Sequence, residues 1–262
     1  MAETINIDAA RVERYITELA TFGKHGETGV WRTVYSPEWV AAQDQVAAWM
    51  TEAGLEVRRD AVGNVWGRLE GSEGGKTIVS GSHIDSQRPG GRFDGALGVI
   101  AALTAIGALK QQFGQPRRTL EVLSLCEEEA SRFPTSNFLG SRAITGAITP
   151  EDALEMVGYD GKTMAEAMAA IGLDATKLPE AKRDDIDIFI ELHIEQGPIL
   201  EQADVPVAVV TAINSIRHYV VELTGRSDHA GARPMDMRLD PMAGAAEIAL
   251  GDAVVVQGLG LL

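Results

Sequence analysis

Short runs of apolar residues alternate along this chain with longer segments that favour helix. The clearest runs are Leu120–Leu125 and Ile186–Leu192, and the near-continuous apolar character of the second is typical of a strand covered on both faces of a sheet. Shorter strands are expected at Leu55–Arg59, Asn64–Leu69 and Lys76–Ser80. Strands that alternate with helices in this way predict the α/β class.

Helix signals lie between the expected strands. Asp8 is a suitable N-cap for a helix from about residue 9 to 20, and Ser36-Pro37 begins a second helix that Gly54 ends. Further helices are expected over 95–109 and across most of 138–171. The character of the chain changes near 212–214, where an alternating strand over 219–223 and a helix from Asp240 to about residue 250 follow. We therefore expect one domain over 1–212 and part of another over 213–262.

The composition excludes several classes of partner. The chain has 23 Lys and Arg against 38 Asp and Glu, and its net charge of −15 argues against nucleic acid or an anionic membrane as a partner. The single cysteine, Cys126, permits no internal disulfide, so a reducing cytoplasm is expected, and its place after an apolar strand predicts a buried thiol. The apolar runs look shorter than the roughly 20 residues that span a bilayer, and the first residues show no secretory signal.

Residues that commonly bind metals follow three of the expected strands. His83 follows the strand that ends near residue 80, Glu128 and Glu129 follow Leu120–Leu125, and His193 follows the strand that starts at 186. Asp94 directly precedes the helix expected from residue 95. In open α/β sheets ligands bind in the crevice beyond the carboxyl ends of the strands. These side chains are therefore expected to converge there.

Histidine and carboxylate ligands suit zinc, and also manganese, cobalt or nickel. Two metal ions about 3.5–4 Å apart need a bridging carboxylate, and Asp94 between glycine-rich segments is the natural candidate. Asp85 could accept the other N–H of the His83 imidazole and fix its tautomer. One of Glu128 and Glu129 would ligate a metal while the other takes a proton from a metal-bound water. The sequence thus predicts a two-metal hydrolase site.

Each of these residues, taken alone, also fits a structural role. His83 could be a polar turn residue and Asp94 could cap the following helix, while the acidic run at 127–129 could be an exposed turn. His229, in a turn after a strand, fits an ordinary surface histidine. The four metal-type positions taken together favour the metal site. No phosphate-binding loop and no serine-nucleophile turn accompanies them.

Four ordered segments carry a family resemblance: GSHIDSQRPGGRFDGALGV, EEEASRFPTSNFLGSRAITG, ELHIEQGPILE and GRSDHAGARPMDMRLDP. At these segments the chain resembles the amidase, hydantoinase and carbamoylase branch of the M20 metallopeptidase-like superfamily. That branch includes N-carbamoyl-L-amino-acid hydrolases, β-ureidopropionases and allantoate amidohydrolases. The resemblance implies a Zn-exopeptidase-like catalytic domain, with a mixed sheet flanked by helices, and the start of a smaller α+β dimerisation domain.

Carried over by motif, the resemblance implies roles for the metal-type residues. His83 and Glu129 would be ligands, Asp94 the bridge, and His193 a ligand of the second metal. Glu128 would be the general base. The implied cofactor is therefore a pair of divalent ions, zinc or else manganese, cobalt or nickel.

Three further residues take roles from the same resemblance. Asp85 would be the carboxylate that supports the metal ligands, and Gln196 would contact the substrate. His229 would belong to the dimerisation domain and reach the active site of the partner subunit, where it helps to stabilise the oxyanion. A homodimer is the implied assembly of the full-length form.

The implied activity is a binuclear metal-dependent amidohydrolase that cleaves an N-carbamoyl or ureido C–N bond of a small molecule. Members of the family continue well beyond residue 262, complete the second domain and return to the catalytic domain with a final histidine ligand. We expect that return to be absent from this chain. Two alternatives stay open: a dipeptidase or aminoacylase of the same superfamily, and an inactive truncated fragment of it.

Overall fold

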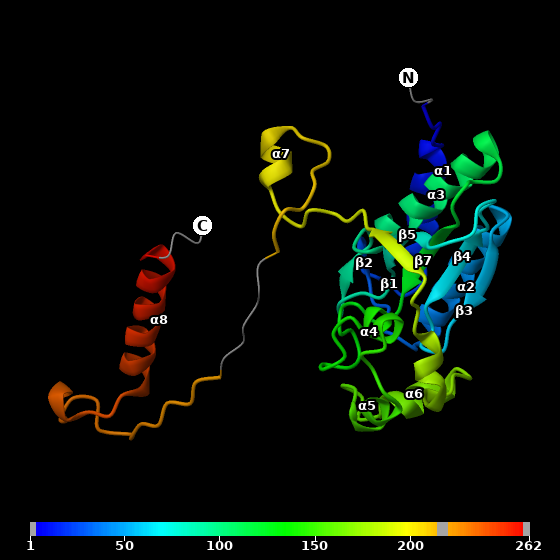
Figure 1. The fold of residues 1–262 in the computed structure, drawn as a ribbon. Helices are drawn as coiled ribbons and strands as arrows, with labels where there is room; N and C mark the ends of the chain where they lie inside the picture. Colours follow the sequence, from blue (N-terminus) through cyan, green and yellow to red (C-terminus); the bar gives the residue numbers. More distant parts are fainter. Residues whose placement is uncertain (1–3, 214–219, 259–262) are drawn as a thin grey trace. The chain divides into compact units, whose positions relative to one another are not determined.

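The computed structural model describes residues 4–213 and 220–258, and the chain divides into two compact units, Met1–Ile199 and Leu200–Leu262. The units are described separately, and Figure 1 labels their elements. The elements of the first unit are α1 (Ala9–Leu19), β1 (Lys24–His25), β2 (Gly29–Val30), α2 (Pro37–Glu52), β3 (Glu56–Arg59), β4 (Val65–Leu69), β5 (Thr77–His83), β6 (Gly90–Gly91), α3 (Ala96–Phe113), β7 (Leu120–Leu125), α4 (Leu139–Thr145), α5 (Pro150–Glu155), α6 (Met164–Ala170), the 3₁₀ helix η1 (Ala175–Ala181) and β8 (Ile186–Ile190). The helix α7 (Ile199–Ala203) begins where the first unit ends.

A mixed sheet in the order β3-β4-β7-β5-β8 forms the centre of the first unit. β3, β4 and β7 pair in antiparallel fashion, whereas β5 runs parallel to both of its neighbours, β7 and β8. This confirms the α/β class and the mixed sheet flanked by helices. β5 is longer than expected, because its pairing with β7 continues until His83 lies opposite Leu125. A small separate sheet, β1-β2-β6, was not predicted.

The first two helices begin as their capping residues predict. The Asp8 side chain accepts a hydrogen bond from the Arg11 backbone N–H at 3.2 Å, and the Ser36 hydroxyl accepts one from the Trp39 N–H at 3.2 Å. Each cap satisfies a donor that the first helical turn leaves free. Helices α4, α5 and α6 confirm the mainly helical character expected for residues 138–171.

The core of the first unit lies between the sheet and its helices. Trp39 and Met50 of α2 and Val99 and Leu103 of α3 are buried together with Val122 of β7. Burying one large aliphatic side chain contributes about 1.5–3 kcal/mol. In Figure 1 α1 and α3 lie side by side, and α3 packs against β5 and β7. This packing holds the start of α3 close to the ends of the strands.

α3 differs from one expectation. Of the described helices it is the one long and apolar enough to cross a membrane by length and composition, although no apolar run was expected to be that long. Its residues from Ala96 to Ile106 nevertheless contribute seven buried side chains or backbone positions to the first unit. α3 is therefore a helix of the protein core.

The thiol of Cys126 is buried, as the sequence predicts. It lies directly after β7, with its Sγ 3.6 Å from the hydroxyl oxygen of Tyr35. Burial raises the pKa of Cys126 well above its ordinary value, because a buried site disfavours the charged thiolate. This thiol is a packed side chain and is poorly suited to act as a nucleophile.

β8 corrects the expectation of a strand covered on both faces. Within the described residues it is an edge strand that pairs with β5 alone, and Ile188, Phe189 and Ile190 are 42%, 44% and 55% exposed. The continuous apolar run allows β8 to be buried on both faces, but it does not specify a neighbour. The described part of the chain places no further strand beside β8. The strand ends at Ile190, two residues before the expected end.

The second unit contains most of α7, the short 3₁₀ helix η2 (Met235–Met237) and α8 (Pro241–Gly258). Tyr219 of the expected strand lies outside the described residues, and residues 220–223 form no strand. The prediction of a strand there was wrong, because an alternating segment needs a paired neighbour and the described residues of this unit provide none. The helix expected to end near residue 250 continues to Gly258.

Candidate metal centre

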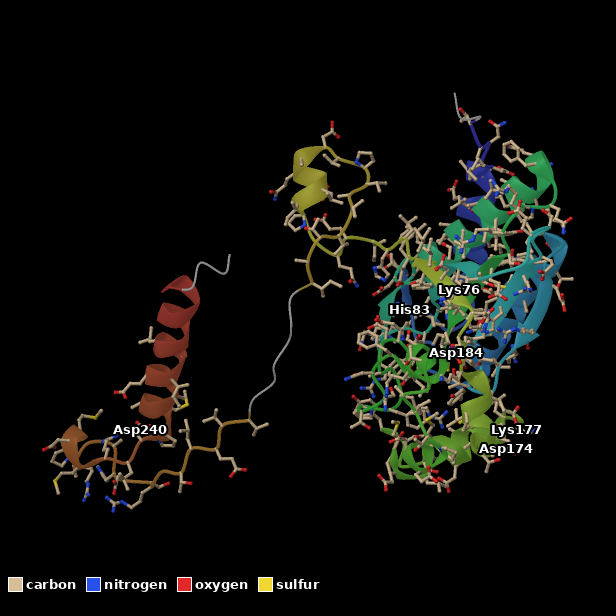
Figure 2. All side chains as sticks on the ribbon, in the orientation of Figure 1. Lys76, His83, Asp174, Lys177, Asp184 and Asp240 are labelled. Carbon is tan, nitrogen blue, oxygen red and sulfur yellow. The ribbon has the colours of Figure 1, made fainter. Side chains whose placement is uncertain are left out.

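The polar ends of three neighbouring strands meet at one edge of the sheet. β5 ends at His83, opposite the end of β7 at Leu125, and the turn after β7 carries Glu128 and Glu129. β8 runs parallel to β5, and His193 follows it by three residues. The convergence expected from strand order alone therefore occurs in the first unit. Figure 2 labels His83 within that unit.

The structure brings five candidate metal residues together. The Nε2 atom of His83 lies 3.6 Å from a carboxylate oxygen of Glu128 and 3.9 Å from Oδ1 of Asp94. The same Asp94 oxygen lies 3.2 Å from Nε2 of His193. These residues form two sets of potential metal ligands, and within each set the ligand atoms lie within 4.8 Å of one another. One set is His83, Asp94 and His193, and the other is His83, Glu128 and Glu129.

The environment of the His83 side chain indicates whether a cation fits this cluster. It is buried, and its Nε2 atom has no hydrogen-bond partner among the described residues. A buried polar atom without a partner costs free energy of about 1–3 kcal/mol. Here the atom faces carboxylate oxygens at distances too long for hydrogen bonds and suitable for ligands around one ion. Histidine and carboxylate donors fit zinc, manganese, cobalt or nickel, so the residues fit a metal centre.

Gly95 allows α3 to start directly beside His83. Its φ is +61°, a left-handed conformation that glycine adopts readily. A Cβ atom at this position would lie 2.4 Å from Nε2 of His83, so any larger residue would collide with the imidazole. The Gly after Asp94 is thus required by the site as well as by the turn.

Asp94 does not cap α3, which was the structural alternative for this residue. The N-cap of α3 is Gly95, and it has no side-chain capping bond. The Asp94 carboxylate instead contacts His193 and accepts a hydrogen bond at 2.9 Å from the amide of Gln196. Gln196, which the resemblance assigned to the substrate, therefore lies at the metal cluster.

The Asp85 carboxylate joins the two loops that carry the cluster. One of its oxygens lies 3.4 Å from Nδ1 of His83, and the imidazole nitrogen also lies 3.1 Å from the Asp85 carbonyl oxygen. The same carboxylate accepts backbone N–H bonds from Glu128 and Glu129, both at 3.1 Å. Asp85 is buried, so it sets the positions of His83 and of both glutamates at once.

Sequence reasoning missed two residues that support the cluster. Gln87 donates from its side-chain amide to the Glu129 carboxylate at 2.8 Å. Ser82 donates to the Glu191 carboxylate, which links the end of β5 to the segment that leads to His193. Gln87 and Glu191 both lie two residues from a residue singled out in the sequence, and this proximity is the signal that could have identified them.

Glu127, the first residue of the acidic run, has a structural role. Its carboxylate accepts hydrogen bonds from the backbone N–H groups of Arg132 and Phe133 at 2.9 and 3.0 Å, and from the hydroxyl of Ser131. Burial, and then the charge of Asp85, raise the pKa of Glu127 to about 7. The run is therefore not an exposed acidic turn, because its first member holds the loop that positions the other two.

The charges at the cluster shift several pKa values. Burial lowers the pKa of His83, but the hydrogen bond and charge of Asp85, with the charges of Glu128 and Glu129, raise it to about 9. Burial raises the pKa of Glu128 and that of Glu129. The hydrogen bond with His193 holds the pKa of Asp94 below its ordinary value. The cluster thus concentrates carboxylate groups around His83 and His193, which is where a divalent cation would bind.

The metal-free protein should lose stability as the pH rises from 7.5 to 9.5. The folded-state pKa of His83, about 9, lies above the ordinary histidine value of 6.5, so the proton on His83 stabilises the fold at low pH and is lost as the pH rises through 9. We expect the free energy of unfolding to fall by about 2 kcal/mol across this window, measured by urea unfolding with a chelator. His83→Gln should remove most of this dependence and leave the smaller part that the raised pKa values of His193 and Cys126 cause, whereas His25→Gln, which changes an exposed histidine, should retain all of it. An unchanged slope in His83→Gln would contradict the assignment.

Asp85→Asn should weaken metal binding about 10–100-fold, because an amide nitrogen would replace one of the two carboxylate oxygens. Oδ1 faces the His83 imidazole and the Glu128 backbone N–H, and Oδ2 faces the Glu129 backbone N–H. A loss of about 1–3 kcal/mol in unfolding free energy should accompany it. Calorimetric titration with Zn²⁺ or Mn²⁺ measures the first effect and urea unfolding the second. Asp184→Asn is the matched control, because that side chain is 83% exposed. Equal metal affinity in both variants would refute the role of Asp85.

His229 belongs to the second unit, where Nδ1 accepts backbone N–H bonds from Gly231 and Ala232 at 3.1 and 3.0 Å. These bonds fix the ring in its turn and leave Nε2 as the nitrogen available for a substrate contact. The role in a partner's active site that the resemblance implies for His229 stays a prediction.

Comparisons with known proteins place the cluster in a family. A model of the peptidase family M20/M25/M40 matches residues 79–258, a range that includes every candidate metal residue. The chain belongs to this family.

Two curated proteins and one solved structure are similar to most of the chain. The chain is 44% identical over 235 residues to an allantoate amidohydrolase of Bacillus subtilis (strain 168), covering 89% of the chain and 57% of that protein. It is 44% identical over 241 residues to an N-carbamoyl-L-amino-acid amidohydrolase of Paenarthrobacter aurescens, covering 91% and 58%. The crystal structure of a hydantoinase/carbamoylase family amidase from Burkholderia ambifaria matches with a TM-score of 0.84 and 32% identity, over 98% of the chain and 63% of that structure. The chain thus spans less than two thirds of the length of these relatives.

Proposed function

We propose that this chain carries the metal-binding part of an amidohydrolase that cleaves the C–N bond of an N-carbamoyl or ureido group. The observation that carries the proposal is the pair of ligand sets that share the buried, unpartnered Nε2 of His83. The names of the relatives, allantoate amidohydrolase and N-carbamoyl-L-amino-acid amidohydrolase, support this substrate class. The site would use two divalent ions, with zinc, manganese, cobalt or nickel as candidates.

We take the metal ligands of this proposal from the family resemblance. His83 and Glu129 would hold one ion and His193 the other, and Asp94 would be the carboxylate shared between them, a role that its proximity to both imidazoles supports. When bound, the ions supply a water molecule of lowered pKa and polarise the substrate carbonyl. Asp85 holds the His83 ring and the backbone of Glu129.

Glu128 is the general base in this proposal. Its carboxylate is 31% exposed, so it can reach both the cluster and an incoming substrate. Burial raises its pKa, which brings the carboxylate closer to the neutral pH at which a base transfers protons efficiently. Glu128 takes a proton from the attacking water and returns it to the departing nitrogen. With an N-carbamoyl amino acid the products are the amino acid, ammonia and carbon dioxide.

Gln196 and His229 complete the substrate contacts in this proposal. The Gln196 amide, now bonded to Asp94, would turn to the substrate, and His229 would stabilise the oxyanion from the partner subunit of a homodimer. The single buried cysteine is consistent with a reducing cytoplasm. The roles of Gln196 and His229 follow from the family resemblance.

Substrate assays test the proposal. The purified chain, loaded with Zn²⁺ or Mn²⁺, is incubated with N-carbamoyl amino acids, allantoate and dipeptides, and release of ammonia or amino acid is measured. We expect turnover of a carbamoyl or ureido compound and none of the dipeptides. Cleavage of dipeptides alone would favour the peptidase that the family's name suggests, and bound metal without any turnover would indicate a metal-binding remnant.

A further inference from the structure

The first unit contains a cavity that none of the candidate metal residues lines. Its volume is about 860 Å³, within the range of about 300–1,000 Å³ typical of small-molecule sites. We call it the aromatic pocket and define it by six of its lining residues: Trp31, Tyr35, Arg88, Arg132, Tyr159 and Lys162.

Two aromatic side chains of this pocket are open to solvent. Trp31 is 46% exposed and Tyr159 is 56% exposed, and Pro37, Val40 and Ile171 add apolar surface to the same wall. Large aromatic groups left exposed around a cavity favour contact with a ligand that has an apolar or aromatic body. The other three tryptophans of the chain are buried, so Trp31 is exceptional among them.

Two cations of the aromatic pocket lack an anionic partner. The Arg88 guanidinium lies 3.4 Å from the ring centroid of Tyr159, and among the described residues its side chain forms no ion pair or hydrogen bond. The Lys162 ammonium likewise forms no ion pair within the described part of the chain. A guanidinium that lies over an aromatic face keeps its N–H donors free in its own plane, where they can bind a carboxylate in bidentate fashion.

The acidic residues of the same wall are already neutralised. Asp160 pairs with Arg132 at 2.8 Å, and Asp44, which also lines the cavity, pairs with Arg59 at 2.8 Å. Arg88 and Lys162 therefore remain without an ion-pair partner among the described residues, in a protein whose net charge is −15. A local excess of positive charge beside aromatic surface selects a ligand that is both anionic and apolar.

We propose that the aromatic pocket binds a small aromatic carboxylate, separately from the metal centre. The ring of the ligand packs against the Trp31 and Tyr159 surface, and its carboxylate pairs with Arg88 and Lys162. This proposal does not depend on the hydrolytic function, because no metal-type residue takes part in it.

Calorimetric titration of the whole metal-free chain with 2-naphthoate tests the proposal. We expect a dissociation constant at or below about 1 mM, which is reasonable for a ligand of this size. Arg88→Gln should weaken binding by about tenfold through loss of the bidentate pair, and Lys162→Gln should weaken it by a few-fold. The uncharged analogue 2-naphthylmethanol should bind at least about tenfold more weakly than 2-naphthoate.

The matched control is Arg14→Gln. Arg14 also lies over a tyrosine ring, that of Tyr15 at 5.4 Å, but it does not line the aromatic pocket. Its replacement should leave the affinity for 2-naphthoate unchanged. Absence of binding up to about 10 mM, equal affinity for the uncharged analogue, or an Arg88→Gln variant that binds as tightly as the wild type would each overturn the proposal.

Discussion

Replacing Asp94 with alanine should leave the protein without bound metal. Its carboxylate lies 3.9 Å from Nε2 of His83 and 3.2 Å from Nε2 of His193, so it is the described carboxylate best placed to contact two ions. Loss of a bridging carboxylate also removes the negative charge that offsets the repulsion between two neighbouring cations. Metal content after dialysis, measured by elemental mass spectrometry, should fall from two ions per chain to none.

Two further variants serve as controls for the Asp94→Ala experiment. His193→Ala removes a ligand of one ion only, so one ion per chain should remain. Asp184→Ala, on an exposed side chain, should keep both. An Asp94→Ala protein that still holds two ions would show that Asp94 is not the bridge.

Glu128→Gln should keep both metal ions and lose hydrolytic activity. Glutamine has nearly the same shape as glutamate but cannot accept a proton, and a positioned general base contributes about 10²–10⁴-fold to a rate. The turnover number on the substrate that the wild-type chain hydrolyses should fall by that factor. Glu129→Gln should instead reduce the metal content, because we assign that carboxylate to an ion.

The opposite pattern of results would exchange the roles of general base and metal ligand between Glu128 and Glu129. Glu128 and Glu129 each share a ligand set with His83, and Gln87 donates to Glu129. If Glu128→Gln lost metal while Glu129→Gln kept it and lost activity, Glu129 would be the base. Equal activity in Glu128→Gln and wild type would remove the general base from the mechanism.

The central fold follows largely from local signals in the sequence. Asp8 and Ser36 cap the helices they were expected to cap, and the apolar run at Leu120–Leu125 is a strand with the same bounds. These features depend on the backbone chemistry of a few neighbouring residues, which a sequence displays directly. Convergence of the metal-type residues could be predicted for a related reason, since parallel strands end at a common edge.

Other features depend on partners distant in the chain. The exposure of Ile190 in β8 and the lack of strand structure at residues 220–223 depend on which segments lie alongside, and an apolar pattern does not specify a neighbour. The triple role of Asp85 was only partly visible, because its bonds to Glu128 and Glu129 join residues more than 40 positions apart. The aromatic pocket could not be predicted from a sequence motif, because Trp31, Arg88 and Tyr159 come from three separate segments.

Counting the metal ions bound by the wild-type chain tests the two-metal site most directly. The chain is stripped with a chelator, loaded with Mn²⁺, freed of excess ion and weighed intact by native mass spectrometry. We predict a mass corresponding to two ions per chain, held by the residues around the unpartnered Nε2 of His83. A chain that binds no ion, or that binds the same number after His83→Ala, would contradict the metal centre and with it the proposed function.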